Sequence, residues 1–176
     1  MSQTSARTLA VWLLMCGIAP NFCGSVQCEP EPPAAHIFLS GKEQLVVGDA
    51  VRGAVLRLAR PECQRLFTIF TDSAGHTLSA NLEAQGNSSS EYLAGLYFVD
   101  GDDSARCRLD EGTAAFTTPG SRVIYVCGAR FANRFARNTT GGEILIIHEL
   151  LHSLGLGENP PTSAEITNLV MARCGN

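Results

Sequence analysis

The sequence predicts an α+β domain that combines a small mixed β-sheet with an N-terminal helix, a buried helix and a C-terminal helix. Apolar residues recur at helical spacing between residues 49 and 58, and short runs of β-branched and aromatic residues follow. Two capping-box patterns then precede apolar segments near the end of the chain. With 176 residues, 45% of them apolar, the chain is long enough for one domain with a core.

The first 25 residues are predicted to be a secretory signal peptide. Arg7 precedes an uninterrupted apolar run over residues 9–19, and small residues follow near Ser25. A run of this length is too short to span a bilayer as a helix. We expect a Pro-rich linker over 26–35, a single domain over 36–176, and a secreted or periplasmic location without membrane attachment after cleavage.

The elements of the first two thirds of the domain follow from local patterns. A helix is predicted from Asp49, with Ala50, Val51 and Leu58 on its apolar face, and Pro61 ends it. Branched and aromatic residues alternate over 66–71 before a turn at 72–75, which predicts a strand. Further strands are expected within 92–99, at 114–118 and at 122–127.

Two helices are predicted in the last forty residues. Thr140 and Glu143 have capping-box spacing before an apolar segment, and Gly155 is the residue type that best tolerates a left-handed helix end. This segment is apolar on nearly every side, which indicates a buried helix. Thr162 and Glu165 form a second capping box at the start of a C-terminal helix.

The cysteines indicate disulfide bonds. Cys28 lies in the linker, and four cysteines follow it in the domain, where an exported location would let them pair. Of the three possible connectivities we favour Cys63 with Cys107 and Cys127 with Cys174. Zinc ligation by these cysteines is the alternative, but no Cys-x-x-Cys pair occurs.

The charge pattern excludes some classes of function. Thirteen basic and seventeen acidic residues give a net charge of −4. No basic stripe occurs, so we expect no nucleic-acid partner. Intrinsic disorder is also disfavoured, because disordered chains combine low hydrophobicity with high net charge.

The predicted buried helix contains the motif His148-Glu149-Leu-Leu-His152. Spacing of four residues places both imidazoles on one helix face, one turn apart, where they can reach a single Zn²⁺ ion. Glu149 lies about 100° around the helix from His148, where it can take a proton from a zinc-activated water. Two buried histidines and a carboxylate without a bound group would be costly in an apolar helix. The motif therefore predicts a zinc site with Glu149 as general base.

The segment 148–158 resembles the zinc signature of the metzincin metallopeptidases. In that family a glycine, here Gly155, turns the chain back, and a third ligand follows three residues later. The resemblance assigns this position to Glu158, where the family has histidine or aspartate. It implies a metzincin-like fold, in which a methionine lies beneath the metal. Met171 is the one candidate, although its place in a predicted helix favours core packing.

Other residues remain open as the third ligand. Some zinc peptidases take it from a glutamate on a downstream helix, which would be Glu165, although Glu165 also fits the capping box. His76, His36 or no protein ligand are the further alternatives. His76 follows Ala-Gly in a predicted turn, which favours an exposed side chain.

We therefore expect an exported zinc-dependent endopeptidase that acts as a monomer on peptides or proteins. His148, His152 and Glu158 would hold the metal, and Glu149 would transfer the proton. The strand at 122–126 would pair with an extended substrate. The alternative is a zinc-stabilised, non-catalytic binding or inhibitory domain. A further alternative has Cys28 capping the zinc in a latent form.

Overall fold

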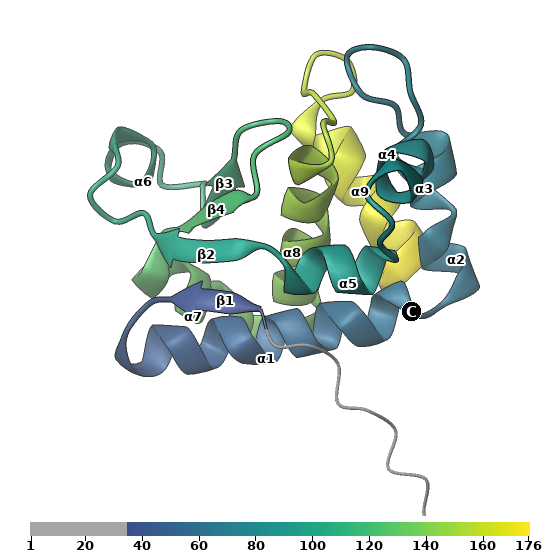
Figure 1. Cartoon of the computed structure of the whole chain (residues 1–176). Helices are drawn as coiled ribbons and strands as arrows, with labels where there is room; N and C mark the ends of the chain where they lie inside the picture. The colour runs from purple at the N-terminus through teal and green to yellow at the C-terminus, as the bar shows by residue number, and fades with distance from the viewer. Residues whose placement is uncertain (1–34) are drawn as a thin grey trace, which may run out of the picture. The chain divides into compact units, whose positions relative to one another are not determined.

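A four-stranded mixed β-sheet lies beside the helices in the computed structural model, which describes residues 35–176 (Figure 1). The sheet order is β1-β2-β4-β3. Strands β1, β2 and β4 are parallel, and β3 is antiparallel to β4. The bounds are β1 His36–Phe38, β2 Tyr97–Asp100, β3 Ala115–Thr117 and β4 Val123–Val126. The predicted α+β class with a small mixed sheet is confirmed.

Helices surround the sheet on its buried side and extend beyond it. The long helix α8 lies between the sheet and α9, and it also packs against α1 and α7 (Figure 1). The helix bounds are α1 Gly41–Leu58, α2 Pro61–Gln64, α3 Leu66–Ile69, α4 Leu78–Ala84, α5 Ser89–Ala94, α6 Ala105–Leu109, α7 Gly128–Arg137, α8 Thr139–Ser153 and α9 Ser163–Cys174. The predicted N-terminal, buried and C-terminal helices are therefore α1, α8 and α9.

Helix α1 begins eight residues before the predicted start at Asp49. Its buried face is formed by Val47, Ala50, Val51, Ala54 and Leu58, at spacings of three and four. The first turn, residues 41–44, is polar and exposed or half-buried, and Leu45 after it is exposed, so this part of the helix contributes no apolar periodicity. The apolar pattern thus identifies the helix but misses its start.

The predicted strand at 66–71 is wrong, because α3 occupies most of this segment. Leu66, Phe67 and Phe70 are the buried residues, and their spacing of one and four is that of a helix face. The alternation of residue types had suggested a strand. The conformation of this segment depends on which of its residues are buried, and the neighbouring helices determine that.

The three later strands occur close to their predicted positions, as β2, β3 and β4. However, β4 pairs with β2 on one side and with β3 on the other. The backbone groups of β4 are therefore engaged within the sheet. The expectation that residues 122–126 pair with a substrate strand is wrong, and β3 is the edge strand on this side.

Helix α8 begins with a different cap from the predicted one. The side chain of Asn138 accepts a hydrogen bond from the amide of Gly141 and caps the helix. Glu143, the expected partner of Thr140, instead forms a half-buried ion pair with Arg57 of α1. At α9, by contrast, the predicted capping box of Thr162 and Glu165 is present.

All four cysteines of the domain are paired, as expected, but the favoured connectivity is wrong. The disulfides join Cys63 to Cys174 and Cys107 to Cys127. Parallel pairing of β2 and β4 brings the chain after β2, which leads into α6, to the end of β4. Packing of α2 on α9 brings the other two cysteines together.

Several expectations fall on residues outside the described range. They are the signal peptide at 1–25, most of the linker at 26–35, and the latent-form role of Cys28. Among residues 35–176, none of the helices is both long and apolar enough to cross a membrane.

Candidate metal centre

Helix α8 is buried on almost every side, as its apolar composition predicts. Ile144, Ile147 and Leu151 belong to the core that α8 shares with its neighbours. Four polar side chains of the same helix are also buried: Ser153, whose hydroxyl donates to the carbonyl oxygen of Leu150, and His148, Glu149 and His152. Buried polar groups need hydrogen-bond or ligand partners, so the surroundings of these side chains indicate what they bind.

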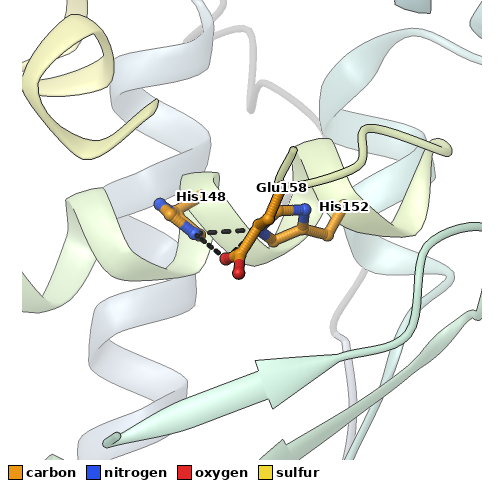
Figure 2. Close-up of side chains that lie close together, drawn as sticks. All are labelled: His148, His152 and Glu158. Atoms are coloured by element: carbon orange, nitrogen blue, oxygen red, sulfur yellow. Dashed lines mark hydrogen bonds and ion pairs between the residues drawn. The ribbon is translucent and has the colours of Figure 1, made fainter. Parts of the chain in front are cut away.

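His148, His152 and Glu158 converge on one point. Figure 2 shows the two imidazoles on α8 and the Glu158 carboxylate, which comes from the loop after the helix, directed toward one another. The Nε2 atoms of the histidines are 2.9 Å apart. Glu158 Oε1 lies 3.1 Å from Nε2 of His152 and 3.7 Å from Nε2 of His148. One nitrogen or oxygen from each residue lies within 4.8 Å of the others, so the group could hold a metal ion.

The turn after α8 brings Glu158 to the imidazoles. Gly155 has φ +108°, a backbone conformation that L side chains rarely adopt. The amide of Leu156 then donates back to the carbonyl of Leu151, 3.1 Å away. The chain therefore reverses at Gly155, which is the role that the sequence pattern predicts for this glycine.

Hydrogen bonds on the outer nitrogens orient both rings. His152 Nδ1 lies 2.7 Å from the carbonyl oxygen of Leu156. A carbonyl only accepts, so this nitrogen carries the proton and the Nε2 lone pair faces Glu158. His148 Nδ1 lies 3.0 Å from Thr167 Oγ1 on α9. Burial lowers the pKa of His148 to about 4, which keeps its ring neutral, as metal ligation requires.

Glu149 lies beside the cluster without taking part in it. Its side chain is buried, and burial raises its pKa to about 8, although the positive charge of Arg106 acts in the opposite direction. Among the described residues, Glu149 Oε2 is the one buried side-chain oxygen or nitrogen without a hydrogen-bond partner. A buried carboxylate oxygen without a partner is costly, and it is typical of a functional group that awaits a ligand.

The cluster opens into a cleft of about 230 Å³. His148, Glu149, His152 and Glu158 all line this cleft. Strand β3 lines it as well, together with residues of α6, α7 and α9. A metal ion at the cluster, the Glu149 carboxyl group and an edge strand would thus face one space.

The other predicted third ligands lie elsewhere. Glu165 Oε2 accepts hydrogen bonds from the amide and the hydroxyl of Thr162, both at 2.8 Å, at the start of α9. His76 is 67% exposed and lies 3.4 Å from Asp72, as the predicted turn suggested. His36 stacks on Tyr97 in the sheet. None of the three belongs to the metal-binding group.

Met171 and Thr167 differ from the sequence-based expectations. Met171 lies on α9 as predicted, but it is 38% exposed, so neither core packing nor a place beneath the metal fits it. Thr167, the partner of His148, was not identified from the sequence, because nothing in the chain marks a threonine nineteen residues after its partner. Comparison with protein-family models, with curated proteins and with solved structures finds no match for this chain.

Proposed function

We propose that this protein is an exported zinc-dependent endopeptidase, distantly metzincin-like, in which His148, His152 and Glu158 hold the metal. The donor set supports zinc, because two imidazoles and one carboxylate are a common ligand set of catalytic zinc sites. The hydrogen bonds on both Nδ1 atoms support it further, since such outer contacts fix metal-binding histidines. Three protein ligands also leave a coordination position for water or substrate.

The single observation that carries the proposal is the buried, unpartnered Oε2 of Glu149 in the same cleft. A purely structural metal site has no need of such a group. When bound, zinc supplies Lewis-acid activation of a water molecule and of the scissile carbonyl. Glu149 takes the proton of that water and passes it to the leaving amine.

Strand β3 supports a peptide as the substrate. It is an edge strand of the sheet, and Ala115, Phe116 and Thr117 line the cleft. An extended peptide can pair with such an edge through its backbone, which aligns a peptide bond without requiring one particular sequence. The order of one helix, several strands and then the helix with the two histidines supports the metzincin resemblance coarsely. The two disulfides fit an oxidising, exported location.

The test compares the wild-type protein with Glu149→Gln on a peptide library, after zinc content has been measured for both. We expect equal zinc content, cleavage by the wild type, and a loss of at least about a hundredfold in the variant, the scale of general-base catalysis. Undiminished cleavage by Glu149→Gln would overturn the proposal. Zinc binding without cleavage by either protein would favour the non-catalytic binding or inhibitory domain.

A further inference from the structure

Two arginines line the cleft beside the metal-binding group. Arg106 comes from α6 and Arg134 from α7, and both side chains are exposed. The acidic residues that line the cleft are Glu149 and Glu158, which the proposed function already uses. The cleft therefore contains two positive charges that metal binding does not require, although that of Arg106 also partly offsets the raised pKa of Glu149.

The guanidinium groups of these arginines are largely available. Arg134 donates one hydrogen bond, 3.1 Å long, to the carbonyl oxygen of Gly112. The guanidinium group of Arg106 lies over the ring of Phe116, 5.3 Å from its centroid. This group forms no hydrogen bond within residues 35–176. Neither forms an ion pair in this part of the chain. Since arginine carries five N–H donors, most of them remain free to bind a ligand.

Arg130, unlike Arg106 and Arg134, is a structural arginine. Its guanidinium group donates to three backbone carbonyls, those of Cys107, Asp110 and Thr113, and so holds the loop below the cleft. Asp110 in that loop accepts hydrogen bonds from the amide of Gly112 and from the Thr113 hydroxyl. The oxygens of Asp110 are thus engaged in their own turn and form no ion pair with Arg106.

Both arginines are also held in place relative to α8. Arg106 is adjacent to Cys107, whose disulfide to Cys127 ties α6 to the end of β4. Arg134 lies on α7, which packs directly on α8. Leu145, about one turn before His148, also lines the cleft. The backbone positions that carry both arginines are therefore fixed relative to α8, which lowers the entropy cost of binding a ligand there.

We propose that Arg106 and Arg134 bind a carboxylate of the substrate close to the scissile bond, so that this protein selects acidic peptides. Guanidinium groups match carboxylates in geometry and charge, and such bonds are stronger than neutral hydrogen bonds. The carboxylate belongs either to an Asp or Glu side chain or to the C-terminus of a peptide. This inference rests on the proposed function, because the cleft must hold a peptide.

The test measures binding rather than turnover. Zinc-loaded Glu149→Gln protein is immobilised and exposed to two random peptide libraries, one with free C-termini and one with amidated C-termini. Retained peptides are identified by mass spectrometry. We expect acidic peptides to be enriched by about tenfold or more over their Asn and Gln counterparts, the scale of one charge-assisted hydrogen bond. Enrichment of acidic peptides in both libraries assigns the carboxylate to a side chain. Retention of peptides with free C-termini over the amidated peptides, whatever their side chains, assigns it to the chain end.

Matched variants separate the cleft from general electrostatic attraction. Adding Arg106→Gln or Arg134→Gln should abolish the enrichment. Arg108→Gln and Arg137→Gln remove exposed arginines of the same two helices that do not line the cleft, and they should leave it unchanged. An equal effect of all four substitutions would overturn the inference.

Failure of this inference and failure of the proposed function give different results. If the wild-type protein cleaves the libraries while the retained peptides show no preference for a carboxylate, only the carboxylate site is overturned. If the protein binds zinc but the wild type cleaves no peptide and the variant retains none, the peptidase proposal fails, and the carboxylate site fails with it.

Discussion

The side-chain amide of Asn81 donates a 2.9 Å hydrogen bond to the carbonyl oxygen of Leu154. The same nitrogen donates to Asp72 Oδ2 at 3.0 Å. Leu154 is the residue after which the chain turns, at Gly155, toward Glu158. Asn81 therefore ties α4 and the turn that begins at Asp72 to the loop that carries the third residue of the metal-binding group.

Replacing Asn81 tests this tie. Asn81→Ala removes both hydrogen bonds and leaves a carbonyl at the end of α8 without its partner, so we expect the free energy of unfolding to fall by about 1–3 kcal/mol. Glu83→Ala, an exposed position on the same helix, is the control and should change it little. Urea denaturation of the metal-free proteins measures both values. Equal stability of the two variants would contradict the role given to Asn81.

The acid stability of the fold should depend on Asp72. The hydrogen bond from Asn81, helped by the amides of His76 and Ala74, lowers the pKa of Asp72 from 3.8 to about 2. A folded-state pKa below the unfolded value means that Asp72 stabilises the fold above about pH 3.8, and that this contribution is lost as the pH falls through about 2. In Asn81→Ala we expect the pKa to rise toward 3.8. An NMR titration of the Asp72 carboxyl carbon measures it, and an unchanged value would refute the assignment.

Two glycines of the loop after α8 give opposite predictions. Gly155→Ala would place a Cβ at φ +108° and 3.0 Å from the Cβ of Asp72, so we expect a loss of about 1–3 kcal/mol of stability and weaker zinc binding. Gly157→Ala has no atom within 4 Å of the added Cβ and should behave like the wild type. Thermal unfolding and competition with a chromophoric chelator measure both effects. Similar behaviour of the two variants would show that the turn at Gly155 does not position Glu158.

Replacing Glu158 should weaken zinc binding, whereas replacing Glu165 should lower only the stability of the fold. Glu158→Ala removes a proposed metal ligand and should weaken zinc binding by more than about a hundredfold, because even indirect contacts to metal ligands contribute that much. Glu165→Ala removes the capping box of α9 and should cost about 1 kcal/mol of stability with unchanged zinc affinity. Chelator competition and denaturation separate the two effects. Loss of zinc affinity in Glu165→Ala alone would reverse the assignment.

Local patterns were sufficient for the elements whose signals lie within the chain. The period of the apolar residues identifies α1, the nearly continuous apolar segment identifies α8, and the capping box of Thr162 and Glu165 locates the start of α9. The same holds for the metal-binding group, since the spacing of His148 and His152 and the turn at Gly155 are properties of one helix and the loop that follows it.

The rest depends on contacts between distant segments. The segment around Leu66 is helical because neighbouring helices bury one of its faces. Glu143 pairs with Arg57 of α1 rather than capping its own helix. One disulfide pair follows from the pairing of β2 with β4, and the other from the packing of α2 on α9. Arg106, Arg134 and Thr167 reach the site from three different helices, so no local motif could have marked them.

The central claim is that His148, His152 and Glu158 hold one zinc ion. A crystal structure of the zinc-loaded protein, with the metal located by anomalous scattering at the zinc absorption edge, tests it most directly. We predict a single peak bound by Nε2 of both histidines and by a carboxylate oxygen of Glu158, at about 2.0–2.2 Å. No peak between these residues, or a peak ligated by other side chains in their place, would contradict the claim.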